Sequence, residues 1–345
     1  MSTDHYIVAS DKVIPGWLQP VAILDLCAAR GLDTHALLQN TALFASDLPW
    51  TGRYISLNQL QQLMANANRL WPGADFPFQF GHQLLQHGLG PLTALFDSQP
   101  CVRAALAMLS KYAALLAPAM TMRIVAPADN EVLLMVRPAA FASVDGIDLV
   151  AAMSALGGML KRFPSIETFR FFFRAAGGDN RENFTALLAG ECCFNAPFDG
   201  VHLTIAEGDA SSADASLRGR VAMADCELLL PRAPFLVESL LRKFGEKGCN
   251  ACDLDGCARQ LGMSQATLKR RLREHGVSFQ QLLDLYQLEL ALIELLLKRA
   301  AVDEVATRLN FHDSSNFRRA FKRWTGLSPS VMKANFNRLQ IPLTK

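Results

Sequence analysis

The spacing of apolar residues divides the chain into a mixed first part and a helical last part. Apolar positions recur at helical spacing over 15–30, 56–70, 101–117 and 147–163, and they form short strand-like runs over 120–126, 131–137, 167–175 and 201–207. The turn sequence over 127–130 separates the first two runs and predicts a strand pair. Helices and strands mixed in this order favour an α/β or α+β domain.

A segment rich in small and polar residues, 207–220, follows and predicts a loop or linker. Pro231 and Pro234 come next, and the spacing of Phe235, Leu236 and Leu240 then begins a new helix. Beyond this point the pattern indicates helices only. We therefore expect two domains, a mixed α/β domain over 1–206 and an all-α domain over 233–340, joined by a linker over 207–232.

The all-α part contains a short helix, a tight turn and a second helix. Gly262 is suited to the left-handed turn that ends the first helix, and Ser264 is a strong N-cap for the helix that begins at Gln265. Leu268 and Leu272 lie four residues apart and predict its buried stripe. This combination is typical of a helix-turn-helix unit.

The same pattern recurs about 48 residues later in the chain. Asn310 stands at the turn, and asparagine tolerates the left-handed conformation better than other side chains. Asp313 is the expected cap, and Phe317 and Phe321 repeat the spacing of the two leucines. A helix predicted over 279–299 would join the two units.

Counting from each cap predicts which residues share the solvent face of each second helix. They are Gln265, Ala266, Lys269, Arg270 and Arg273 in the first unit, and Ser314, Ser315, Arg318, Arg319 and Lys322 in the second. Both faces carry cations at the fifth, sixth and ninth positions after the cap. Arginine can bind guanine through two hydrogen bonds, so we predict that these ten residues contact DNA. The alternative, a solvated basic face on two ordinary helices, does not explain why turn and charges both repeat.

Charge is distributed unevenly along the chain. Residues 240–345 contain 18 Lys and Arg against 10 Asp and Glu, whereas residues 1–239 contain the other 16 and 22, so the net charges are +8 and −6. A basic last third favours a polyanionic partner. The chain begins without a secretory signal pattern and has no apolar run long enough to span a bilayer, so we expect a cytoplasmic protein with reduced cysteines and no membrane partner.

The helical part resembles the DNA-binding domain of the AraC/XylS family of bacterial transcription regulators. Ala258 to Gly276 with Phe279 match the first unit, and Val305 to Pro329, above all Arg319 to Pro329, match the second. Ala266 and Asn310 depart from the pattern, where a larger residue and Gly are usual. The resemblance implies double-stranded DNA as partner, contact with RNA polymerase and activation of transcription.

The first part resembles the arabinose-binding-like sensor domain of one subgroup of that family, which includes regulators of ornithine and arginine use. The matching segments are Phe80 to Gly90, Ser98 to Pro100 before the helix at 101–117, and Cys193 to Phe198. This likeness implies a small-molecule effector of unknown identity and a role in homodimerisation. Arg170, Phe172 and Arg174 are candidates to line an effector pocket, with a core strand as the alternative.

Other chemistry finds little support in the sequence. Cys249, Cys252 and Cys257 have a spacing that invites a zinc or redox interpretation, but a fourth soft ligand is missing, and we predict no metal site. A Gly-rich phosphate loop, a nucleophile elbow and a metalloprotease helix are all absent, so we predict no catalytic residue, no cofactor and no enzyme. An enzyme domain fused to a DNA-binding tail and a regulator that needs no ligand remain the alternatives.

Overall fold

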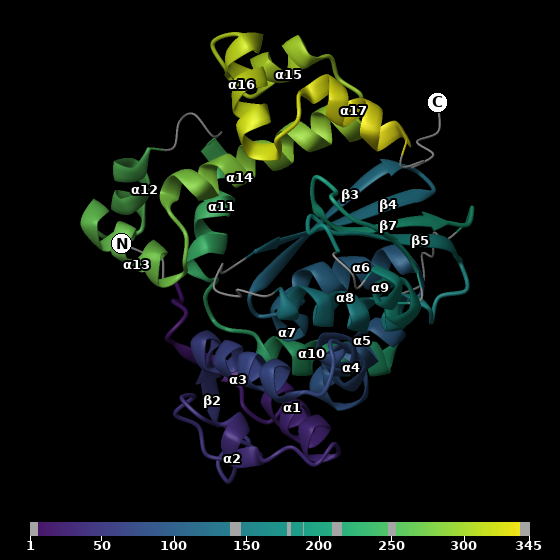
Figure 1. The fold of residues 1–345 in the computed structure, drawn as a ribbon, viewed down its shortest axis with the longest axis vertical. Coiled ribbons are helices and arrows are strands. Elements are labelled where there is room, and N and C mark those ends of the chain that lie inside the picture. The colour runs from purple at the N-terminus through teal and green to yellow at the C-terminus, as the bar shows by residue number, and fades with distance from the viewer. Residues whose placement is uncertain are drawn as a thin grey trace.

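The computed structural model describes residues 6–138, 146–177, 181–188, 190–208, 216–247 and 253–338. The chain begins with a small antiparallel sheet and helices that pack around it (Figure 1). These elements are β1 (Lys12–Pro15), α1 (Gln19–Ala28), α2 (Thr34–Leu37), β2 (Tyr54–Ser56) and α3 (Leu57–Leu70). Ser56 begins α3 as half of a capping box, because its hydroxyl accepts from the Gln59 amide while the Gln59 side chain accepts from the Ser56 amide.

A second group of helices forms the centre of the N-terminal domain. It consists of α4 (Phe76–Gln83), the π-helical turn η1 (Leu84–Gly88), α5 (Pro91–Asp97), α6 (Val102–Lys111), α7 (Ala113–Leu116) and α8 (Ile147–Leu160). Helices α4 and α8 approach closely at Gly81, where a Cβ atom would lie 2.5 Å from the Ala151 carbonyl oxygen. The helix predicted over 101–117 divides into α6 and α7, because the backbone leaves the helical region at Tyr112.

A five-stranded sheet completes this domain. Its strands are β3 (Met120–Ala128), β4 (Glu131–Pro138), β5 (Ile166–Phe172), β6 (Glu191–Cys193) and β7 (Asp199–Ile205), and α9 (Arg181–Leu188) lies between β5 and β6 in sequence. The strand order is β3-β4-β7-β5-β6, and all neighbours are antiparallel except β5 and β6. The strands predicted from the sequence are confirmed.

The C-terminal part is entirely helical in its described residues, which confirms the two-domain architecture. Its helices are α11 (Leu236–Lys247), α12 (Leu254–Gln260), α13 (Gln265–Glu274), α14 (Phe279–Leu292), α15 (Val302–Arg308), α16 (Ser314–Thr325) and α17 (Pro329–Arg338), and the π-helical segment η4 (Ile293–Leu297) continues α14. Helix α10 (Leu217–Leu229) comes before this part of the chain.

The prediction of a linker over 207–232 is wrong for its second half, because α10 is a helix packed on α5 of the N-terminal domain. Cys226 is fully buried there, and Glu227 accepts hydrogen bonds from the Lys111 ammonium and the Tyr112 hydroxyl. Gly219 packs closely there, since a Cβ atom on it would lie 2.5 Å from the Ser98 hydroxyl oxygen, whereas residues 209–215 lie outside the described residues.

The two faces of the large sheet are buried against different partners. Phe171 and Phe173 pack in the core that contains α6 and α8, whereas Phe172, between them, points to the opposite face. That opposite face packs against α14, η4 and α17, so the sheet lies between the helices of its own domain and those of the C-terminal domain (Figure 1). Phe198 and Phe336 are in ring contact across this interface, with centroids 6.4 Å apart.

A buried carboxylate crosses the same interface. Glu289 on α14 is 6% exposed, and its Oε1 accepts from Arg123 on β3 and from Arg137 on β4, both at 2.8 Å. Arg137 Nε lies 2.5 Å from the other carboxylate oxygen. Two adjacent strands of one domain therefore hold one side chain of the other. A buried carboxylate requires such partners, because desolvation would otherwise exclude its charged form.

Replacing Glu289 by Gln should destabilise the docked structure, because both guanidinium groups lose their counter-charge in a largely buried interface. Removing one partner of a buried pair costs about 3 kcal/mol at the lower end of the usual range, which applies here because Arg123 remains partly exposed. The free energy of unfolding from urea titration of the full chain measures this. Glu304→Gln, which removes the exposed partner of Arg308 on α15, is the matched control, and equal effects of the two variants would contradict the role assigned to Glu289.

Candidate nucleic-acid interface and ligand cavity

The first helix pair, α12 and α13, has the local geometry expected of its sequence. Gly262 adopts a φ of +68° in the turn, and the Ser264 hydroxyl accepts from the Thr267 amide at 3.2 Å at the start of α13. Leu268 and Leu272 are buried in a core that they share with α11. These contacts fix α13 on its apolar side and leave its other side exposed.

The second pair, α15 and α16, repeats this geometry. Asn310 adopts a φ of +55°, and the Asp313 carboxylate accepts from the Asn316 amide at 2.6 Å, which holds the pKa of that carboxyl below its ordinary value. Phe317 and Phe321 are fully buried. Gly326, with a φ of +76°, ends α16. The turns, caps and buried stripes predicted for both pairs are therefore present.

Nine of the ten residues predicted to face DNA are exposed, and Ser314 is half-buried. The exposed residues are Gln265, Ala266, Lys269, Arg270, Arg273, Ser315, Arg318, Arg319 and Lys322. Each pair therefore presents a continuous basic face on α13 or on α16.

Local partners hold some of these side chains in place. Arg270 forms an ion pair with Glu274 at 2.6 Å, Gln265 donates to Asp255 at 2.9 Å, and Arg319 donates to Asn316. Arg318 lies 3.6 Å from Asp303. All of these contacts are with exposed groups, so solvent or a ligand can replace them at little cost.

The two pairs differ in how they are anchored. The core of α12 and α13 continues into α11, whereas Phe317 and Phe321 belong to the apolar cluster that includes the sheet residues Leu133 and Phe172. The second pair is thus packed, through α14 and α17, on the N-terminal domain. The sequence gives no sign of this, because an inward-facing Phe is equally compatible with a core that lies within one domain.

His275, at the C-terminal end of α13, is fully buried. Neither ring nitrogen has a hydrogen-bond partner among the described residues. Burial lowers the pKa of His275 below its ordinary value, because the charged ring would be desolvated. The first pair therefore contains a neutral histidine within its core.

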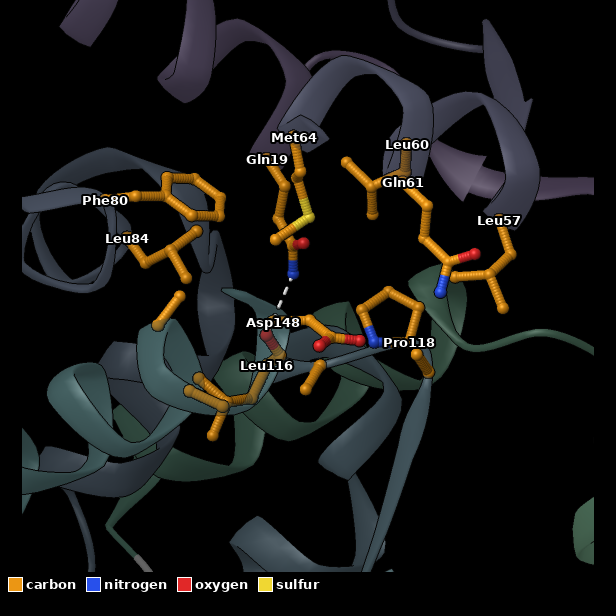
Figure 2. A pocket seen from close by; sticks show the side chains of 14 residues that line it. Gln19, Leu57, Leu60, Gln61, Met64, Phe80, Leu84, Leu116, Pro118 and Asp148 are labelled. Carbon is orange, nitrogen blue, oxygen red and sulfur yellow. Dashed lines mark hydrogen bonds between the residues drawn. The ribbon is translucent and has the colours of Figure 1, made fainter. Parts of the chain in front are cut away.

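A small cavity of about 20 Å³, enough for about one water molecule, lies inside the N-terminal domain, between α1, α3, α4, α7 and α8 (Figure 2). Its wall is mostly apolar, with Leu60, Met64 and Phe80 among the lining residues. Gln19 enters from α1 and Gln61 from α3, and Asp148 at the start of α8 also lines the cavity.

The two glutamines of the cavity differ in their partners. The Gln19 amide donates to the carbonyl oxygens of Leu115 and Leu116, at 2.9 and 3.0 Å, and so ties α1 to the end of α7. The Gln61 amide nitrogen is buried and has no hydrogen-bond partner among the described residues. A buried donor without a partner costs about 1–3 kcal/mol, so the cavity offers a hydrogen bond to an incoming acceptor.

The predicted effector residues Arg170, Phe172 and Arg174 do not line this cavity. Phe172 is buried on the opposite face of the sheet, and Arg170 forms an ion pair with Glu191 at 2.5 Å. The backbone of Arg174 donates to Asp199. Only the last two residues of β5, Phe171 and Phe172, are buried, one on each face of the sheet, and this favours the alternative of a core strand with flanking charges. The sequence analysis did not identify Gln19 and Gln61 as cavity residues. The feature that could have indicated them is a polar side chain on an otherwise apolar helix face.

The described residues hold no cluster of three or more metal-ligating side chains. Cys257 packs in the core of the first helix pair, while Cys249 and Cys252 lie outside the described residues, so the structure does not test the predicted absence of a site there. Among the described helices, none combines the length and apolar character that crossing a bilayer requires.

Two family models match the chain. A model described as the arabinose-binding domain of AraC transcription regulators matches residues 31–206, just over half of the chain, and a helix-turn-helix domain model matches residues 257–335. Both models cover the regions in which the sequence predicted them.

Curated relatives match over short segments of the chain. The ornithine utilization regulator of Pseudomonas aeruginosa is 46% identical over 78 residues, which are 23% of each chain. The transcriptional regulator VqsM of the same organism is 34% identical over 80 residues, 23% of this chain and 25% of that one. The matched segment thus spans about a quarter of either relative, and both are transcription regulators rather than enzymes.

A solved structure, the transcriptional regulator CdpR from Pseudomonas aeruginosa, aligns over 92% of this chain and 98% of its own. The TM-score is 0.41 and the sequence identity is 16%.

The stability of this chain should fall with pH through His275. The pKa of His275 in the folded state lies below its value in the unfolded chain, which is near 6.5. As the pH falls below about 6.5, the ring is therefore protonated in the unfolded chain before it is protonated in the folded protein, and the free energy of unfolding decreases. Thermal melting between about pH 7.5 and 5 measures this. The His275→Leu variant, which keeps an apolar side chain but cannot titrate, should show a shallower loss; an unchanged slope would contradict the assignment.

Proposed function

The chain belongs to the AraC family of transcription regulators, and we propose that it reads a DNA sequence with α13 and α16 under the control of a small molecule bound in the N-terminal cavity. The observation that carries this proposal is the repetition of one basic face on two capped helices. Each face is exposed, each lies opposite a buried apolar stripe, and each has cations at equivalent positions. The chain's uneven charge distribution supports the same conclusion.

In this proposal both helix pairs are helix-turn-helix units, and the helix between them sets their spacing. Helix α14 and η4 together form 19 consecutive helical residues, about 28 Å long at 1.5 Å per residue. In Figure 1, α14 runs from the pair α12–α13 toward the pair α15–α16. Successive major-groove segments on one face of DNA lie about 34 Å apart, a distance that this helix and the two units can span.

Within the second unit the side chains take different roles. Arg319 lies on the centre of the exposed face and is the proposed base-reading residue, since arginine can bind guanine with two hydrogen bonds. Lys322 is a point charge one turn later and is the proposed phosphate contact. Ser314 and Ser315, at the start of α16, are placed to meet phosphate oxygens near the helix N-terminus. Ala266, at the equivalent position of α13, offers no polar group, so we propose that the first unit discriminates less.

The effector is proposed to be a small, largely apolar molecule with a hydrogen-bond acceptor for Gln61, and the cavity, at about 20 Å³, must widen to admit it. Its binding would favour one arrangement of the domains over another, and the cavity is well placed for this, because its wall includes α8, which packs beneath the sheet that carries the C-terminal domain. We further propose activation of transcription, the usual role in the family, through contact with RNA polymerase. A second copy of the chain is the other proposed partner.

Arg319→Ala should reduce affinity for the operator by about 1–3 kcal/mol and relax the preference for one base pair. Lys322→Ala should weaken binding to all sequences alike and lower the slope of the logarithm of affinity against the logarithm of salt concentration by about one. The operator is first identified by selecting bound sequences from random DNA. Titrating fluorescently labelled operator and its single-base variants with protein, at several salt concentrations, then distinguishes the two roles. A uniform loss for Arg319→Ala would assign that residue to phosphate instead.

The same titration compares the two units. Arg270→Ala removes the equivalent residue of α13, which is already engaged by Glu274. A loss of specificity larger than that of Arg319→Ala would show that the first unit, and not the second, dominates base recognition.

The cavity is tested by thermal shift of the full chain with a panel of amino acids, fatty acids and sugars. A compound that stabilises the wild-type protein should bind about tenfold more weakly to Gln61→Leu, because that variant loses the hydrogen bond that the Gln61 amide nitrogen offers. Gln62→Leu, on the next residue of α3 and outside the cavity lining, is the control. Equal loss in both variants would place the ligand elsewhere, and turnover of a compound would favour the enzyme alternative.

A further inference from the structure

A groove opens beside the exposed face of α13. It is lined by the second half of α13, by the turn that follows this helix and by the first residues of α12 and α14, and its volume is about 630 Å³. The cavity of the N-terminal domain, at about 20 Å³, is far smaller. The volume of this α13–α14 groove lies within the range of sites that hold a small organic molecule.

The floor of the α13–α14 groove is apolar. Leu272 and Val277 line it and are almost completely buried, whereas Leu254 and Phe279 line it and are partly exposed. The Phe279 ring is held in place by Phe244 of α11, with the ring centroids 5.5 Å apart and the rings nearly perpendicular. The phosphates and sugars of DNA would leave such a floor in contact with polar groups, so a ligand with an apolar body suits it better.

The rim of the groove is basic. Lys269 and Arg273, one turn apart on α13, line it, and its described lining contains no acidic residue. The neighbouring Arg270 and Arg271 both pair with Glu274, at 2.6 and 3.7 Å. Lys269 and Arg273 have no acidic partner in the part of the chain that the structure describes. The positive charge on the groove side of α13 is therefore available to a ligand.

We propose that the α13–α14 groove binds an amphipathic organic anion, a carboxylate on an apolar body, which competes with DNA for Lys269 and Arg273. The carboxylate meets the two cations at the rim, where a guanidinium can hold it with two hydrogen bonds. The apolar body lies over Leu272, Val277 and Phe279 and removes their exposed surface from water. A purely polar anion would leave this floor wet, and an uncharged molecule would leave both cations without a partner.

This site differs from the N-terminal cavity in location and in effect. Lys269 and Arg273 are also predicted to contact DNA, so a bound anion would neutralise two cations of the first helix pair. By linkage, the anion lowers the affinity for DNA by the same factor by which DNA lowers the affinity for the anion. This competition rests on the proposed DNA-binding role of α13, whereas the binding of the anion does not.

Equilibrium dialysis of the full chain with radiolabelled decanoate, without DNA and below the concentration at which micelles form, is the first test. Lys269→Gln and Arg273→Gln should each weaken binding about tenfold, because each removes a charge that meets the carboxylate. Arg270→Gln removes a cation of the same helix that does not line the groove, and it should leave the affinity nearly unchanged. Equal losses in all three variants would indicate general attraction to a basic face and would overturn the proposal.

The same measurement separates the groove from the N-terminal cavity. Gln61→Leu alters that cavity and should leave decanoate binding unchanged, because Gln61 lies in the other domain. A loss of binding in Gln61→Leu that Lys269→Gln does not share would assign decanoate to the cavity and overturn the groove site.

Varying the ligand tests the two halves of the site. Affinity should increase from hexanoate to octanoate to decanoate, by up to about tenfold for each added pair of methylene groups, because each group that meets the floor leaves water. Octanol and octylammonium share the chain but carry no negative charge, and they should bind at least about tenfold more weakly than octanoate. Equal binding of the three head groups, or no dependence on chain length, would contradict the proposal. Cosedimentation with phosphatidylglycerol vesicles would assign the groove to a membrane surface and overturn the free ligand.

Titration of a fluorescently labelled DNA duplex with the protein tests the competition. Saturating decanoate should weaken DNA binding and lower the slope of the logarithm of affinity against the logarithm of salt concentration by about two, because two phosphate contacts are lost. The double variant Lys269→Gln/Arg273→Gln should bind DNA more weakly, and decanoate should not weaken it further. A wild-type affinity that decanoate leaves unchanged would overturn the competition. A protein that binds decanoate but no DNA would refute the proposed function and still support the groove site.

Discussion

Burial of both faces of the five-stranded sheet is the constraint on which the arrangement of this molecule depends. One face is covered from within the N-terminal domain by α6 and α8, and the other is covered by α14, η4 and α17 of the C-terminal domain. Apolar strand residues such as Leu133 and Phe172 would otherwise be exposed to water as one continuous patch, which monomeric domains avoid. Docking of the two domains is therefore part of the core and not an incidental contact.

The electrostatics of the interface add specificity to that apolar contact. Glu289 is compatible with its buried position only while Arg123 and Arg137 lie opposite it, so the domains have one favoured register. The basic faces of α13 and α16 point away from this contact and remain exposed. In the docked arrangement the sheet thus restrains the second helix pair without covering its candidate DNA-binding surface.

Much of the helical domain was predictable because its determinants are local. A turn needs a residue that tolerates positive φ, a helix needs a cap, and a stripe needs apolar residues four apart; Gly262, Ser264 and Leu268 meet these needs within seven residues of each other. The strands were predictable for the same reason, since a short apolar run between turn residues limits the alternatives. The location of the pocket was not predictable, because the sequence of Arg170 to Arg174 is equally compatible with a strand that lines a cavity and with a strand that lies between two packed layers.

The sequence by itself determined most of the helices and strands, the two domains, the repeated caps and the basic faces, all of which follow from contacts between residues close in the chain. Only the tertiary structure decided that Leu217–Leu229 is a packed helix, that Gln19 and Gln61 meet at one cavity, and that Glu289 lies between two arginines. These features join residues separated by tens to more than a hundred positions. Pattern and propensity constrain neighbours, whereas burial against a distant surface depends on how whole elements pack.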